Sequence, residues 1–95
     1  MKVFVLKVEL RANWVHSLKE KRMVVKSIIQ RLKNKFNISV CEVEEQDIHQ
    51  KIVIGICGIG GSSGVIDSTI ENIITFIENN CDAEMLHIER EVEEY

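Results

Sequence analysis

The sequence predicts an α+β fold with the element order β-α-β-β-α-β, and three observations predict it. Two segments repeat apolar residues at the helical period, and four shorter segments alternate in polarity or are rich in β-branched residues. The chain has 95 residues, which is enough for one hydrophobic core but not for two. We therefore expect a single domain over residues 1–95.

The first strand is predicted over residues 2–11. An apolar residue recurs at every second position: Phe4, Leu6, Val8 and Leu10. Lys7 and Glu9 lie between them, so one face of this strand is predicted to be buried and the other exposed.

The first helix is predicted over residues 17–35. Ser17 followed three residues later by Glu20 is a capping-box pattern, in which the serine oxygen accepts a hydrogen bond from a backbone N–H of the first turn. Apolar residues then share the face that packs on the core: Leu18, Val25, Ile28, Ile29, Leu32 and Phe36.

Residues 37–45 and 51–59 are rich in β-branched side chains and are predicted to pair as a hairpin. A flexible segment over residues 58–64 follows, in which Ser62 or Ser63 is expected to cap the next helix. That helix is predicted over residues 65–80, because isoleucines recur there at helical spacing: Ile66, Ile70, Ile73, Ile74 and Ile77.

The last strand is predicted over residues 83–92, with Leu86, Ile88 and Val92 on one face. The acidic tail over residues 91–95 is expected to fray.

Right-handed crossovers place the first and third strands side by side in the middle of a four-stranded antiparallel sheet. The second and fourth strands are then its two edges, and both helices cover one face. This is the ferredoxin-like arrangement.

Positive and negative charges are divided between two parts of the chain. Residues 1–35 contain 10 Lys and Arg against 2 Asp and Glu, a net charge of +8. The other 60 residues contain 2 against 13, a net charge of −11, so the formal net charge of −3 hides a polarised molecule. This polarity points to an anionic partner, or to a second copy that presents its acidic part.

The candidate nucleic-acid-binding residues lie on the first predicted helix. Three cations fall within about 60° of Lys19 on the side opposite the apolar face: Arg22, Lys26 and Lys33. These four residues extend about 21 Å along the helix axis, a length that spans several backbone phosphates. Lys21 and Arg31 are expected to flank them as further contacts.

Three interpretations of this basic helix stay open. It binds an anionic partner, it pairs with the acidic part of another subunit, or it is an ordinary solvated face. The first is favoured because Glu20 is the only acid among seven bases, so stabilising ion pairs within the helix are missing and like charges repel. The predicted function is therefore RNA binding through phosphates.

No catalytic, cofactor or metal site is predicted, and we expect no enzymatic activity. The three histidines and three cysteines lack metal-binding spacing. The glycine-rich segment 58–64 lacks the Lys-Ser or Lys-Thr pair of a phosphate-binding loop. Small acylphosphatases share this size and element order, but they need a glycine-lined anion loop where this chain has Ala-Asn-Trp-Val-His at residues 12–16.

No apolar segment approaches the roughly 20 residues of a membrane span, so no membrane partner is expected. The odd number of cysteines favours free thiols in a reducing cytoplasm. Cys41 and Cys57 are expected to be buried thiols that act as small apolar side chains. Trp14 is expected to be either a lid over the core or an exposed contact.

The alternative function is a homodimeric protein-interaction module. Val3 and Val5 are predicted to face away from the helices, with Met85 beside them, and to form an apolar patch. The two edge strands offer a second route to self-association, by strand addition.

Three segments resemble the YlxP family of small bacterial proteins of unknown function. They are residues 16–22 (His-Ser-Leu-Lys-Glu-Lys-Arg), 36–43 (Phe-Asn-Ile-Ser-Val-Cys-Glu-Val) and 46–47 (Gln-Asp). The resemblance extends over essentially the whole chain. The chain differs from the family pattern at His49, where tryptophan is common, and at Trp14, where a smaller residue is usual.

The resemblance implies a ferredoxin-like domain whose genes often lie near those of translation factors and ribosome-binding factor A. It therefore implies a role in ribosome maturation, with ribosomal RNA or a ribosomal subunit as partner. No catalytic residues are established for the family, so the resemblance assigns none to this chain.

Overall fold

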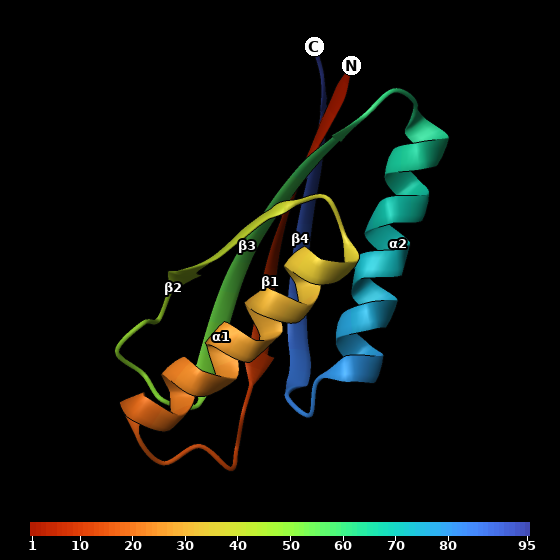
Figure 1. Ribbon diagram of the computed structural model, residues 1–95. Coiled ribbons are helices and arrows are strands. Elements are labelled where there is room, and N and C mark those ends of the chain that lie inside the picture. The colour runs from red at the N-terminus through yellow and green to blue at the C-terminus, as the bar shows by residue number, and fades with distance from the viewer.

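Strand β1 (Lys2–Arg11) lies in the middle of a four-stranded antiparallel sheet with the order β2-β3-β1-β4 (Figure 1). The computed structural model describes residues 1–95. β3 (Lys51–Gly60) pairs with β1 along its whole length, and β2 (Ser39–Glu44) and β4 (Glu84–Glu94) form the two edges. The predicted α+β fold class and the predicted strand order are confirmed.

Helices α1 (Leu18–Lys35) and α2 (Ser63–Asn80) cover the same face of the sheet and leave the other face open (Figure 1). Ser17 caps α1 as predicted, because its Oγ accepts a hydrogen bond from the Glu20 N–H at 3.1 Å. The Glu20 carboxylate accepts the His16 N–H at 2.7 Å, one residue earlier than a standard capping box requires. Ser62 caps α2 in the same way, so this helix begins two residues before the predicted position.

One cluster of 18 buried residues fills the space between the sheet and the helices. The alternating apolar residues of β1 face the isoleucine stripe of α2 and the apolar face of α1, as their spacing predicts. The rings of Phe36 and Phe76 meet edge to face, with centroids 5.6 Å apart, and join the two helices. Because each fully buried aliphatic side chain contributes about 1.5–3 kcal/mol, this cluster is the main source of stability.

The C-terminal tail pairs with β1 and does not fray as expected. Glu94 lies opposite Lys2, and Met1 and Tyr95 exchange two backbone hydrogen bonds of 2.7 and 3.1 Å. β1 is ten residues long, and its backbone groups need partners on both sides, so the last strand extends to match it.

A β-bulge in β4 changes which residues of this strand face the helices. Leu10 lies opposite Met85 and the preceding residue of β1 lies opposite His87, so Leu86 has no partner. Met85 therefore turns to the helix side and packs against the core. It is not beside the exposed valines of β1, and the predicted apolar patch loses this residue.

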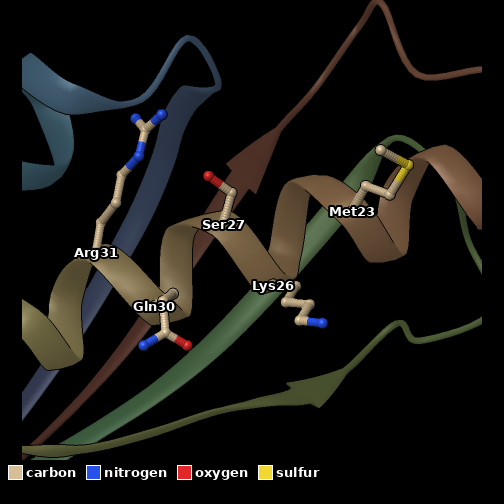
Figure 2. A pocket seen from close by; sticks show the side chains of 5 residues that line it. All are labelled: Met23, Lys26, Ser27, Gln30 and Arg31. Carbon is tan, nitrogen blue, oxygen red and sulfur yellow. The ribbon is translucent and has the colours of Figure 1, made fainter.

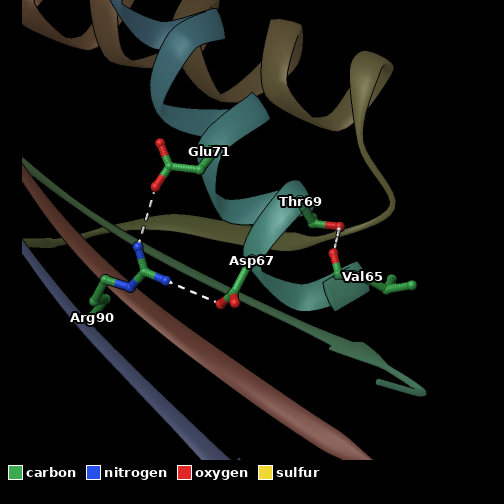
Figure 3. Close-up of polar contacts among 5 residues, drawn as sticks. All are labelled: Val65, Asp67, Thr69, Glu71 and Arg90. Atoms are coloured by element: carbon green, nitrogen blue, oxygen red, sulfur yellow. Dashed lines mark hydrogen bonds and ion pairs between the residues drawn. The ribbon is translucent and has the colours of Figure 1, made fainter. Parts of the chain in front are cut away.

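Arg90 attaches edge strand β4 to α2. Its guanidinium nitrogens lie 3.3 Å from Asp67 Oδ1 and 3.4 Å from Glu71 Oε1 (Figure 3). These side chains are exposed, so the contact contributes roughly 0–1 kcal/mol and mainly orients the strand.

Candidate nucleic-acid interface

Four cations lie on the outer face of α1, and we call them the basic ridge: Lys19, Arg22, Lys26 and Lys33. All four side chains are exposed. None of them forms an ion pair or a side-chain hydrogen bond within the protein. The structure therefore leaves their charges available to an external anion.

Carboxylates close to the basic ridge are already engaged elsewhere. Glu20, the only acid of α1, accepts the His16 N–H. Glu42 of β2 lines a shallow hollow together with Arg22 and Lys26, but its ion pair is with Lys21. The ridge consequently keeps its positive charge.

Lys21 is buried, so the prediction that it contacts a nucleic acid is wrong. Its side chain is 1% exposed, and its Nζ lies 3.0 Å from Glu42 Oε2 and donates a hydrogen bond to the Glu45 carbonyl. The contact with Glu42 lacks hydrogen-bond geometry, so Coulomb attraction holds it. The sequence contained a signal: Lys21 precedes Val25 by four residues and Ile28 by seven, which places it within the apolar stripe of the helix.

Arg31 lies on the side of α1 that faces α2. It is exposed, but its Nη1 donates a hydrogen bond of 2.6 Å to the carbonyl of Asn80, the last residue of α2. The guanidinium thereby satisfies an end carbonyl and offsets the negative end of that helix dipole. Arg31 is held within the protein, away from the basic ridge, and we do not include it among the candidate phosphate contacts.

The outer surface of α1 has a shallow hollow lined by Met23, Lys26, Ser27, Gln30 and Arg31 (Figure 2). All five side chains come from one helix, so the hollow has no opposite wall. Small-molecule sites enclose most of their ligand. This surface instead suits a large partner that lies along the helix.

Two cations outside α1 were not predicted as binding residues. Arg11 ends β1 and Lys51 begins β3, and they lie directly opposite each other in the sheet. Neither forms an ion pair, whereas Lys7 of the same strand pairs with Glu44 at 2.6 Å. The hydrogen bond to Glu44 raises the pKa of the Lys7 ammonium. Only the strand register brings Arg11 and Lys51 together, so local sequence patterns contain no signal for this pair.

Trp14 is exposed and does not form a lid over the core, since 42% of it is accessible. Cys41 and Cys57 are also exposed, contrary to the prediction, because they face the open side of the sheet, whereas their neighbours Val40 and Ile56 face the helices and are buried. All three cysteines are free thiols.

No group of three or more His, Cys, Asp or Glu side chains is placed to hold a metal ion. Neither helix combines the length and the apolar character needed to cross a membrane.

The fold and the basic ridge together define a small ferredoxin-like α+β protein with a one-sided cationic helix. A family model described as "Protein of unknown function (DUF503)" matches residues 3–90, and the chain belongs to this family. The uncharacterized protein YlxP of Bacillus subtilis (strain 168) is 38% identical over 63 residues, which are 66% of this chain and 68% of that protein. The predicted resemblance to YlxP is thereby confirmed.

A solved structure, the de novo designed protein Foldit4, is similar in fold. It covers 98% of both chains with a TM-score of 0.53 at 14% sequence identity. At this identity the likeness concerns the fold alone.

Proposed function

We propose that this protein is a non-enzymatic, cytoplasmic RNA-binding protein that associates with the ribosome, with a role in ribosome maturation. The observation that carries the proposal is the basic ridge, whose four cations are exposed, free of ion pairs and aligned along one helix face. Contacts of this kind to phosphates position a nucleic acid without reading its sequence. Ribosomal RNA is proposed as the partner on the strength of the resemblance to the YlxP family.

The acidic remainder of the chain limits the kinds of RNA that the protein is expected to bind. Outside residues 1–35 the net charge is −11, which repels polyanions except where the basic ridge faces them. Affinity for any duplex is therefore expected to be weak, and a structured RNA whose shape fits α1 is expected to bind best.

The test is the salt dependence of RNA affinity. If the basic ridge neutralises about four phosphates, the slope of log affinity against log salt is near −3, and a fourfold rise in salt weakens binding roughly 60-fold. Replacing Lys19, Arg22, Lys26 and Lys33 with Glu is expected to abolish binding. Lys35→Glu, at an exposed position of the same helix outside the ridge, is the control and should weaken binding only slightly. An affinity that does not change with salt, or with the fourfold replacement, refutes the proposal.

A second candidate function, a homodimeric interaction module, is favoured by the open face of the sheet. Val5 and Ile59 are 50% and 68% exposed there. In the register of β1 and β3, Val5 lies opposite Cys57 and Ile59 lies opposite Val3. Light scattering at two salt concentrations separates the candidates. A dimer that survives high salt and is lost in Ile59→Asp supports this apolar face, whereas a dimer lost in high salt supports pairing between basic and acidic surfaces.

A further inference from the structure

Two loops meet at the end of the molecule where α1 begins (Figure 1). Residues 12–17 connect β1 to α1, and residues 45–50 connect β2 to β3. A hollow between the loops is lined by His16 from the first and by Asp47, Ile48, His49 and Gln50 from the second. Unlike the surface of α1, this hollow has walls from two separate segments.

Hydrogen bonds hold both walls in place. Gln50 Nε2 donates to the carbonyls of Asn13 and Val15, at 3.2 Å each, and the Ala12 N–H donates to the Gln50 carbonyl at 2.8 Å. The buried ammonium of Lys21 holds the start of the second loop by donating a hydrogen bond to the carbonyl of Glu45. The loops are therefore ordered before any ligand arrives, which lowers the entropic cost of binding.

The lining has the chemistry of a site for one nucleobase. His16 and His49 supply an exposed imidazole ring from each loop, and such rings stack on unpaired bases. Asp47 forms no ion pair or side-chain hydrogen bond within the protein, and an ionised carboxylate only accepts hydrogen bonds. Guanine has two adjacent donors on its Watson–Crick edge, N1–H and the exocyclic amine, whereas adenine has an acceptor at N1. A carboxylate at this position therefore favours guanine over adenine.

Two cations at the base of the loops can bind the phosphate next to a base in the hollow. Arg11 precedes the first loop and Lys51 follows the second. Because Ala12 bonds to Gln50, alternation makes Arg11 and Lys51 a pair without backbone hydrogen bonds, in which the side chains approach most closely. Arg11 also lies opposite Glu84 of β4, but no ion pair joins these two residues. Like charges directly opposite each other destabilise a sheet, and an anion between Arg11 and Lys51 reduces that repulsion.

We propose that this hollow binds an unpaired guanine of the RNA. Its phosphates contact Arg11 and Lys51 on the sheet side and Lys19 of the basic ridge on the helix side. This inference rests on the proposed function and specifies its substrate class: an RNA that presents a guanine in a loop, a bulge or a single-stranded end.

The test uses the full chain and three RNA hairpins with one stem and an all-uridine loop that carries a single guanine, adenine or inosine. Affinities are measured by fluorescence anisotropy at one salt concentration. The guanine hairpin is expected to bind about tenfold more tightly than the adenine hairpin. Inosine keeps N1–H but lacks the amine, so the affinity of the inosine hairpin is expected to lie between the other two affinities.

Asp47→Asn is expected to remove or reverse the guanine preference, because the asparagine amide both donates and accepts hydrogen bonds and can therefore pair with adenine. Asp82→Asn, at an exposed acid in the turn before β4, is the matched control and should keep the preference. Replacing Arg11 and Lys51 with Gln should weaken binding of all three hairpins alike, because both residues contact phosphates.

The outcomes separate this inference from the proposed function. Equal affinities for guanine and adenine, with binding still lost in the fourfold ridge variant, overturn the guanine site and leave RNA binding standing. A guanine preference that Asp47→Asn does not change also overturns the site. Failure of any RNA to bind, including structured ribosomal RNA, overturns both.

Discussion

Lys21 of α1 and Glu42 of β2 form a buried ion pair, with 3.0 Å between the ammonium nitrogen and a carboxylate oxygen. Lys21 also donates a hydrogen bond to the carbonyl of Glu45, whose φ of 59° is the only positive value at a non-glycine residue. One side chain of the basic helix therefore contacts both a short edge strand and the loop after it. The same residue that seemed from its charge to be a phosphate contact is part of the framework that holds the candidate interface.

Removal of the Lys21 ammonium is expected to destabilise the protein strongly. Lys21→Met leaves the carboxylate of Glu42 unpaired in a largely buried site, and breaking such a pair costs about 3–5 kcal/mol. Lys21→Met combined with Glu42→Leu should recover much of this loss, since no buried charge remains. Chemical denaturation gives the free energies of unfolding. Lys19→Met at an exposed position is the control, and an equal effect there would contradict the framework role.

Gly58 is expected to resist substitution by alanine. A Cβ at this position would lie 2.6 Å from Cε1 and 2.7 Å from Cζ of Phe4, a ring that is 1% exposed and closely packed. Gly58→Ala should therefore cost about 1–3 kcal/mol of unfolding free energy through overpacking. Gly61→Ala is the matched control, because a Cβ there meets no atom within 4 Å. Equal stabilities of the two variants in thermal or chemical unfolding would show that the ring moves aside freely.

The contact between the two ends of the chain is expected to depend on pH. The hydrogen bond from Lys2, 2.7 Å away, lowers the pKa of the Glu94 carboxyl. Because this pKa is lower in the folded state than in the unfolded state, the contact stabilises the protein above the unfolded pKa. Its contribution is lost as the pH falls through the folded pKa.

The prediction is that Glu94→Gln lowers stability slightly at neutral pH and that the difference from the wild type vanishes in acid. Unfolding by urea at a series of pH values measures it. Glu93→Gln, at an exposed acid without an ion pair, is the control. A difference between wild type and Glu94→Gln that grows as the pH falls would reverse the predicted sign.

The three thiols are expected to react at different rates. Partial burial raises the pKa of the Cys81 thiol, so a smaller fraction is present as the nucleophilic thiolate. Cys41 and Cys57 are exposed, and iodoacetamide should modify them before Cys81. Peptide mass spectrometry over time follows the three sites, and unfolded protein provides the reference rates. Modification of Cys81 first would show that its burial does not protect it.

Local sequence patterns determined the kinds of elements and the fold class. The alternation in β1, the Ser17 cap and the isoleucine stripe of α2 each involve residues a few positions apart, and such interactions are visible in the chain itself. The segregation of charge likewise located the basic ridge, because positions on one helix share a known angular spacing.

Only the tertiary structure decided which cations are available. Lys21 meets a backbone carbonyl 24 residues away and Arg31 one 49 residues away, and both leave the set of predicted contacts. Arg11 and Lys51 become neighbours through strand register, and a bulge in β4 moves Met85 to the core side. Lys21 is the one residue here with a local signal, because it lies within the apolar stripe of α1. The other outcomes depend on packing between segments that are distant in sequence, and such packing leaves no mark on the periodicity of either segment.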